Sequence, residues 1–186
     1  MLEFAVLGLL HEAPMHGYEL RKRLFDLLGP FRAFSYGSLY PTLRRLLRAG
    51  WIAEESPEYT SEEVVRAARI RRARRVYKLT AEGKEHFAEL LADAGPQTWG
   101  DDGFGVHLAF FSRTSAEVRM RILEGRRRRV EERREGLRAA LARAEQKIDR
   151  YTLELHRMGL ESSEREVRWL NELIAHEQAE QREAER

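Results

Sequence analysis

Seven basic residues fall between positions 66 and 78 of this 186-residue chain, and no acidic residue lies among them. The net charge of the whole chain is only +2, so this local block says more than the overall charge. Guanidinium groups without counter-charges can neutralise phosphates and release the counterions of duplex DNA. We therefore expect DNA contacts from the six arginines of Arg66–Arg75, the alternative being a solvated loop. The seven residues are Arg66, Arg69, Arg71, Arg72, Arg74, Arg75 and Lys78.

Hydroxyl, glycine and basic residues upstream of this block form a second candidate group. Serine and tyrosine hydroxyls can donate to phosphates or base edges, and glycine allows close approach of the backbone to a phosphate. Core packing is the alternative for Tyr18, and for Tyr40 we expect core packing or phosphate contact rather than base reading. The candidates are Tyr18, Lys22, Arg23, Ser35, Tyr36, Gly37, Ser38, Tyr40, Thr42, Arg44 and Arg45.

Residues that could support catalysis or hold a metal form no recognisable pattern. The chain has six histidines at spacings that suit no metal site, and no glycine-rich phosphate loop. Glu172 and His176 are one helical turn apart and could bind a metal weakly, but a salt-bridged helix surface is the better interpretation. The absence of cysteine excludes disulfides, thiolate metal sites and cysteine nucleophiles. We expect no enzymatic activity and no cofactor.

The elements that must position the candidates are three helices and two strands. Apolar residues recur at helical spacing through Leu2–His11, His16–Leu28 and Ser35–Ala49. Trp51–Glu55 and Val76–Leu79 have the character of short strands, and they flank the basic block as the two strands of a wing would. Ser56–Arg75 is long for a hairpin loop, and Glu62–Ile70 within it has helix-compatible spacing.

The start of the third helix is open to two interpretations. With Ser38 as the capping residue, Pro41 falls in the first turn, where its missing N–H costs nothing. With Ser35 as the cap, Pro41 is interior to the helix. Gly50 follows the helix, at a position where a left-handed residue is expected.

The second half of the chain is predicted to be almost entirely helical. A helix at Ala81–Ala94 ends at Gly95-Pro96, and a glycine- and aspartate-rich linker follows. We expect domains at 1–95 and 106–186 with the linker at 96–105. Thr114 and Glu117 have the spacing of a capping box. The arginines of Arg126–Arg129 are expected to be solvated, because acidic residues follow them.

Apolar residues in this half recur at alternating steps of four and three, the seam of a coiled coil. The seam is expected to stop at Gly159, and a last helix is expected at Ser163–Glu183. Because a narrow stripe on a helix pair buries little area alone, we predict a homodimer through Thr114–Glu183. The dimerisation candidates are Leu123, Val130, Leu137, Leu141, Ile148, Tyr151, Leu155, Met158, Val167, Leu170 and Ile174.

Aromatic residues are concentrated near the expected domain junction. Packing between the domains is the favoured interpretation, and binding of a small aromatic effector is the alternative. The residues are Trp99, Phe104, His107, Phe110 and Phe111.

Three motifs resemble the PadR family of transcriptional regulators: HGYEL at His16–Leu20, SYGSLYPTLRRLLRAGWI at Ser35–Ile52, and RRVYKLTAEG at Arg74–Gly83. The C-terminal half is similar in length and helix pattern to the longer-tailed branch of that family. The resemblance implies an N-terminal winged helix, a C-terminal dimerisation part, repression as the usual mode, and small aromatic effectors.

The sequence therefore predicts a mainly α fold, with an N-terminal winged helix-turn-helix, a small β-hairpin wing and a C-terminal coiled-coil domain. We expect a homodimeric repressor that binds a pseudo-palindromic promoter site in double-stranded DNA. The alternative is a winged-helix module for protein interaction. The run Phe4–Leu10 lacks the flanks of a signal peptide, and no segment reaches ~20 apolar residues. The protein is expected to be soluble and cytoplasmic, without a membrane partner.

Overall fold

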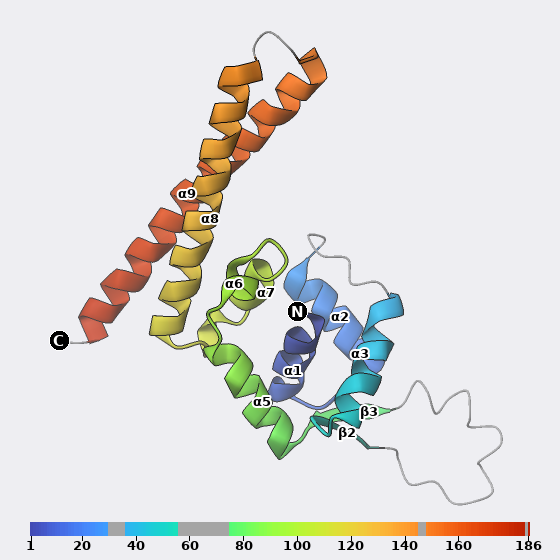
Figure 1. Cartoon of the computed structure of the whole chain (residues 1–186). Helices are drawn as coiled ribbons and strands as arrows, with labels where there is room; N and C mark the ends of the chain where they lie inside the picture. Colours follow the sequence, from blue (N-terminus) through green and yellow to red (C-terminus); the bar gives the residue numbers. More distant parts are fainter. Residues whose placement is uncertain (30–35, 56–74, 145–147, 185) are drawn as a thin grey trace, which may run out of the picture. The chain divides into compact units, whose positions relative to one another are not determined.

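The structure, a computed structural model, describes residues 1–29, 36–55, 75–144, 148–184 and 186. The chain forms two compact units, the first from residues 1–93 and 105–113 and the second from residues 94–104 and 114–186. Figure 1 labels most of their helices and strands. Residues 105–113 pack with the first unit, whereas the sequence analysis assigned residues 106 onward to the second domain. The reason is apolar burial, since Val106 and Phe110 join the core of the first unit.

The first unit is a winged helix. It contains α1 (Leu2–Glu12), β1 (Met15–His16), α2 (Gly17–Leu28), α3 (Tyr36–Arg48), β2 (Ile52–Glu55), β3 (Val76–Leu79), α5 (Ala81–Ala92), most of α7 (Phe104–Leu108) and the 3-10 helix η1 (Phe111–Arg113). Its antiparallel sheet has the strand order β1-β3-β2, with Met15 opposite Tyr77 and Ile52 opposite Leu79. The two-residue strand β1 was not predicted.

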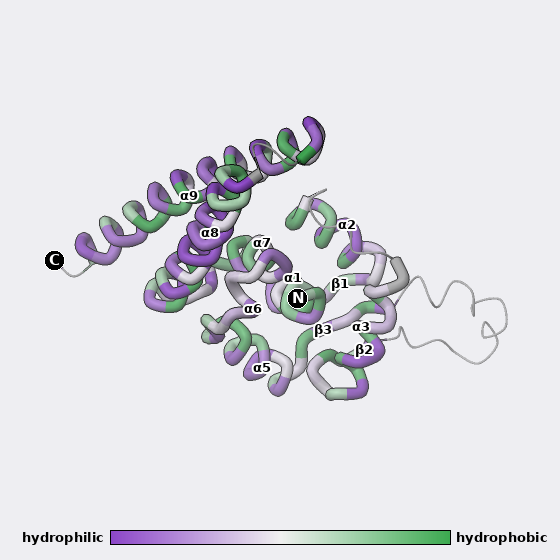
Figure 2. The backbone as a smooth tube through the Cα atoms, turned by 45° about the horizontal axis from the view of Figure 1, so that its top comes forward, coloured by the Kyte–Doolittle hydropathy of each residue, from purple (hydrophilic) through white to green (hydrophobic). Residues whose placement is uncertain are grey.

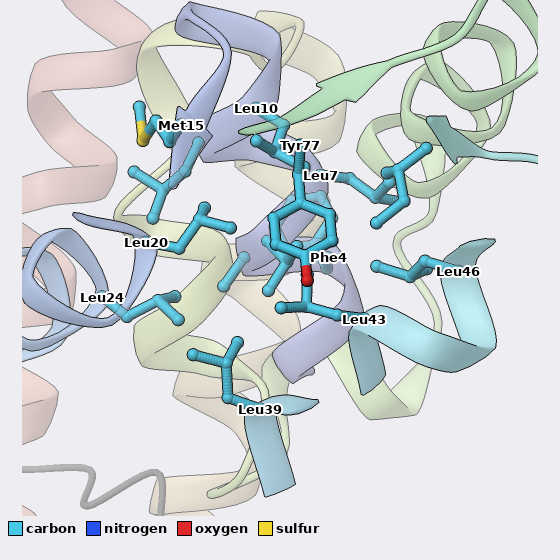
Figure 3. Packing of buried hydrophobic residues seen from close by; sticks show 14 of the residues in the cluster. Phe4, Leu7, Leu10, Met15, Leu20, Leu24, Leu39, Leu43, Leu46 and Tyr77 are labelled. Atoms are coloured by element: carbon cyan, nitrogen blue, oxygen red, sulfur yellow. The ribbon is translucent and has the colours of Figure 1, made fainter. Parts of the chain in front are cut away.

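The core of this unit forms where three helices meet over the sheet. Helix α1 is buried along most of its length, as its apolar sequence predicts. Helices α2 and α3 contribute apolar residues from one face each, and Figure 3 shows them converging on α1 and Tyr77. The labelled side chains are Phe4, Leu7, Leu10, Met15, Leu20, Leu24, Leu39, Leu43, Leu46 and Tyr77.

The second unit is built on two long helices that run side by side in opposite directions (Figure 1). They are α8 (Ala116–Ala144) and α9 (Arg150–Ala184), and the short helix α6 (Pro96–Trp99) packs on α8. Hydrophobic and hydrophilic residues alternate along both long helices in Figure 2. The fold class predicted from the sequence is thus confirmed, as mainly α with a small antiparallel sheet.

Two predictions about the second unit are wrong. The seam does not run along one helix, because Ile148 lies in a bend between α8 and α9. Gly159 does not end a helix but lies inside α9. A methyl group at Gly159 would lie 3.3 Å from Leu137 of α8, so close helix packing accounts for this glycine.

The start of α8 also differs from the prediction. The side chain of Ser115 accepts a hydrogen bond from the N–H of Val118 at 3.4 Å. Ser115 therefore caps the helix, a role for which the sequence analysis considered Thr114. The carbonyl oxygen of Thr114 accepts a hydrogen bond from Arg119 at 2.8 Å.

Candidate nucleic-acid interface

The DNA-binding candidates that the structure describes lie on α2, α3 and the start of β3. Tyr36 and Gly37 form the first turn of α3, and only their backbone is described. Because α3 begins at Tyr36, Pro41 is interior to the helix. Six candidates lie outside the described residues and remain predictions: Ser35, Arg66, Arg69, Arg71, Arg72 and Arg74.

Burial separates the remaining hydroxyl residues. Tyr18 is 68% exposed, which excludes core packing as its role. Tyr40 is 44% exposed, and a methyl group at Gly17 would lie 3.5 Å from its hydroxyl, so its ring rests against the start of α2. Thr42 is only 8% exposed and points into the core side of α3, so it is not available to a base. Ser38 is half-buried.

Three of the basic candidates already have acidic partners. Arg45 pairs with Glu3 of α1 at 2.8 Å, and Arg75 pairs with Glu54 of β2 at 2.8 Å. The third pair joins Arg23 of α2 to Glu12 of α1 at 3.3 Å. All three arginines are exposed, and such pairs contribute about 0–1 kcal/mol. DNA phosphates can therefore compete for these arginines at small cost.

Two basic candidates keep their charge uncompensated. Within the described ranges, neither Lys22 of α2 nor Arg44 of α3 has an ion pair, and both are exposed. Lys78 of β3 pairs with Glu55 of β2 across the base of the wing. A DNA phosphate can therefore bind Lys22 or Arg44 without displacing an acidic side chain from either of these two candidates.

Strand β1 fixes the start of α2 relative to the wing. The backbone N–H of His16 donates to Glu19 at 2.8 Å, which closes a capping box at the helix start. The Nδ1 of His16 lies 3.3 Å from the carbonyl oxygen of Arg75, next to β3. Tyr18 and Lys22 are thereby set at a defined distance from the strands of the wing. A two-residue strand has no sequence pattern by which we could have predicted it.

The base of the wing is held by a glycine and a threonine. The hydroxyl of Thr80 donates to the carbonyl oxygen of Gly50 at 2.7 Å and accepts from the N–H of Gly83 at 3.0 Å. Gly50 has a φ of 74°, the left-handed conformation that was expected after α3. Burial, with a smaller contribution from Glu54, raises the pKa of Tyr77, so its phenol stays neutral at physiological pH.

The five aromatic residues considered for an effector site are used in packing within the two units. In the first unit, His107 stacks on Phe4 with ring centres 4.5 Å apart, and Phe110 meets Phe4 edge-on at 5.1 Å. Burial lowers the pKa of His107 from 6.5 to about 4. In the second unit, Phe104 meets Trp169 edge-on at 6.0 Å. Four of the five side chains are almost fully buried: Phe104, His107, Phe110 and Phe111.

Across the part of the chain that the structure describes, there is no group of three or more side chains suited to a metal ion. Among the described helices, none is long and apolar enough to cross a membrane.

Comparison with known proteins finds a family match over most of the first unit. Residues 6–89 match the family model described as the transcriptional regulator PadR-like family. The negative transcriptional regulator PadR of Bacillus subtilis (strain 168) is 26% identical over 91 residues. That alignment covers 49% of this chain and 45% of the relative, so it spans less than half of the relative's length.

Solved structures of similar proteins cover nearly the whole chain at low identity. Bacillus subtilis PadR in complex with operator DNA is 20% identical, with 95% of this chain and 98% of that chain covered and a TM-score of 0.42. The complex of the same protein with p-coumaric acid gives the same values. A PadR-like regulator of Bacillus cereus is 22% identical, with 97% and 99% covered and a TM-score of 0.41.

Proposed function

We propose that the protein is a homodimeric repressor that binds promoter DNA, because residues 6–89 match the PadR-like family of transcriptional regulators. The winged helix presents α3 to the major groove of a pseudo-palindromic site, and the basic wing contacts the neighbouring backbone. The observation that carries the proposal is the pair of exposed cations without an ion pair in the described ranges, Lys22 of α2 and Arg44 of α3. The exposed side chains of Tyr18 and Tyr40 lie on the same two helices. Groups of this kind neutralise phosphates and set the register on a duplex.

Dimerisation is supported by a second apolar stripe on α9. Apolar residues of α8 and of the first stripe of α9 are already buried within the chain: Leu123, Val130, Val167, Leu170 and Ile174 are at most 5% exposed. Because one chain already buries these five, we propose a dimer contact through other apolar residues. Tyr151, Leu155 and Met158 are 60% to 83% exposed, and Trp169 is 41% exposed.

These four exposed residues share one face of α9. At about 100° per residue, they fall within roughly 60° of one another and about 120° from the buried stripe. Exposing this much apolar surface is unfavourable at ~25 cal/mol per Å2, and a second copy would cover it. We assign the dimer contact to this face.

DNA binding is tested by fluorescence anisotropy with a duplex from the region upstream of the protein's own gene. The repressor model predicts tight binding that weakens steeply as salt rises. Replacing Lys22 or Arg44 by glutamine should weaken binding and lower the salt slope by about one each. Lys84→Gln removes the same charge at an exposed position of α5, outside the proposed interface, and is the matched control. Alanine at Arg71, Arg72, Arg74 and Arg75 together should flatten the slope further.

The rival function is protein interaction by a winged helix that does not select DNA. It predicts equal affinity for the promoter duplex and a shuffled duplex, and no effect of Arg44→Gln. That result would overturn the repressor proposal. A direct comparison of the two duplexes at one salt concentration separates the functions.

The dimer contact is tested by sedimentation velocity with two matched variants. Leu155→Glu places a carboxylate on the exposed apolar face of α9 and should give monomers. Ala175→Glu makes the same charge change on a third face of α9, where the residue is exposed, and should leave the dimer intact. A dimer in both variants would contradict the assignment of this face.

Regulation by a small molecule completes the proposal. Bacillus subtilis PadR has been crystallised with p-coumaric acid, which supports a small aromatic effector for this chain. The five aromatic residues of the sequence analysis remain candidates. Their burial means that a ligand among them has to displace side chains that are already packed.

A further inference from the structure

Helix α1 carries a glutamate at each end, and each glutamate holds an exposed arginine of a neighbouring helix. Near its start, Oε2 of Glu3 accepts from Nη2 of Arg45 in α3 at 2.8 Å. At its end, Oε2 of Glu12 accepts from Nη1 of Arg23 in α2 at 3.3 Å. The two pairs form because α1 packs against both α2 and α3 (Figure 1). Both arginine side chains are 58% exposed and are DNA-binding candidates.

The second oxygen of each carboxylate has a partner outside α2 and α3. Oε1 of Glu3 lies 3.1 Å from Nε2 of His86 in α5. Oε1 of Glu12 accepts from Nη2 of Arg113 in η1 at 3.2 Å. These second partners are less exposed than the arginines of α2 and α3, at 20% for His86 and 31% for Arg113. Each carboxylate therefore keeps a partner when its exposed arginine leaves.

Further contacts hold the second partners in place. The ring of His86 stacks on Trp51 with ring centres 3.7 Å apart. Nη1 of Arg113 lies 3.0 Å from Nδ1 of His11, so two residues of α1 bind this guanidinium. By contrast, Arg23 and Arg45 have no second acidic partner among the described residues. Of the partners of Glu3 and Glu12, the two exposed arginines are thus the ones that a phosphate can remove.

We propose that Glu3 and Glu12 limit the affinity of the protein for DNA, because each competes with DNA phosphates for one arginine. The inference rests on the proposed function, in which α2 and α3 face the duplex. Phosphate contacts carry no sequence information, so the two carboxylates lower the affinity for promoter DNA and for unrelated DNA alike. A purely structural role predicts the opposite sign, since loosening α2 or α3 from α1 would weaken DNA binding.

Fluorescence anisotropy of the full chain with a promoter duplex and a shuffled duplex tests the sign. Glu3→Gln and Glu12→Gln should each tighten binding to both duplexes by about two- to fivefold, the range to which the energies of exposed ion pairs correspond. Glu85→Gln removes the same charge at an exposed position of α5 and should leave both affinities nearly unchanged. Unchanged or weaker binding of Glu3→Gln and Glu12→Gln, with the fold kept in thermal unfolding, would overturn the proposal.

A double-mutant cycle separates competition for one arginine from a general change of charge. Glu12→Gln should give no gain in an Arg23→Gln background, because the arginine that it releases is absent. Glu3→Gln should likewise give no gain in an Arg45→Gln background. Gains that persist in both backgrounds would show that the carboxylates act through their overall field, and the proposed competition would be wrong.

The second partner of Glu12 provides an independent test. Arg113→Gln leaves Arg23 as the remaining arginine on this carboxylate, so DNA binding should weaken. The same substitution in a Glu12→Gln background should have a smaller effect, because no carboxylate is left to hold Arg23. An equal effect in the two backgrounds would contradict the sharing of Glu12 between the two arginines.

The outcomes for this inference and for the proposed function can be told apart. Equal affinity for the promoter and the shuffled duplex overturns only the selective repressor, and the gains from Glu3→Gln and Glu12→Gln still decide the role of the carboxylates. Selective binding without these gains overturns the carboxylate role and leaves the repressor intact. Absence of binding to both duplexes overturns the two together.

Discussion

Gly125 of α8 is where the indole of Trp99 rests on the helix. A methyl group at Gly125 would lie 2.5 Å from Cδ1 and 2.7 Å from Nε1 of Trp99, closer than real carbon contacts allow. Gly136, eleven residues further along α8, has nothing within 4 Å of such a group. The same substitution to alanine should therefore stabilise the protein at Gly136 and lose that gain at Gly125.

The magnitude follows from two opposing contributions. Alanine in place of glycine inside a helix stabilises it by about 0.5–1 kcal/mol. Gly136→Ala should show this gain alone. At Gly125 the added methyl must push the indole away, and overpacking costs about 1–3 kcal/mol. Gly125→Ala should thus be neutral to about 2 kcal/mol destabilising, and about 1–3 kcal/mol less stable than Gly136→Ala.

Urea unfolding followed by circular dichroism at 222 nm gives both free energies. A double-mutant cycle with Trp99→Leu isolates the contact, because removing the indole should restore the stabilising effect of alanine at Gly125. Tryptophan emission supplies a local readout, since a displaced Trp99 indole should change its spectrum in Gly125→Ala only. Equal stabilisation by Gly125→Ala and Gly136→Ala would refute the placement of Trp99 on α8.

Three further predictions concern the first unit. Burial lowers the pKa of His107 from 6.5 to about 4. The stability that the neutral imidazole contributes is complete above pH 6.5 and is lost as the pH falls toward 4, by about 2–3 kcal/mol at pH 4.5. In urea unfolding, the free energy of unfolding should differ less between pH 7 and pH 4.5 for His107→Leu than for the wild type, and an equal difference would contradict the prediction. Gly83→Ala places a methyl group 1.9 Å from the backbone oxygen of Trp51, which cannot move away. The substitution should lower stability by about 3 kcal/mol or more in thermal unfolding. A neutral result would mean that α5 is not packed against Trp51. Thr80→Ala removes the cap of α5 and should cost about 1 kcal/mol, with Thr80→Ser as the control that keeps the hydroxyl.

The helices of the first unit could be predicted because their apolar periodicity and their caps agree. Leu39, Leu43 and Leu46 recur at steps of four and three, and all three are buried. The end of α3 just before Gly50 could also be predicted, because glycine readily adopts the left-handed conformation found there. Local sequence and tertiary packing favour the same structure in this region, so periodicity was sufficient.

The turn between α8 and α9 was missed, although one residue indicated it. The carboxylate of Asp149 accepts hydrogen bonds from the N–H groups of Tyr151 and Thr152 at 2.9 Å and 3.1 Å, as a helix cap does. The Thr152 hydroxyl also donates to it, and these bonds lower the pKa of Asp149. We followed the heptad pattern across this cap, since the pattern continues on both sides of it.

The ion pairs of the candidate interface could not be predicted from spacing. Glu3 lies 42 residues from Arg45, and Glu54 lies 21 residues from Arg75. Only the packing of α1 against α3, and the register of β2 and β3, bring these charges together. The sequence identified which residues are cationic, but the fold decides which of them keep an uncompensated charge for a phosphate.

The arginines of α8 show the same dependence on the fold. The sequence analysis took Arg126–Arg129 for a solvated surface, yet Arg126 is 7% exposed and lies 5.3 Å from the centre of the Phe104 ring. It donates to Asp101 and Glu166, both at 2.6 Å, and Arg133 donates to the same oxygen of Asp101 at 2.6 Å. These hydrogen bonds lower the pKa of Asp101 against the opposing effect of its own burial. A buried guanidinium is tolerated only when acidic groups pair with it, so Arg126 of α8 requires Asp101 beside it. This pairing holds residues 94–104 against α8. Most of the segment that was expected to be a linker is therefore part of the second unit.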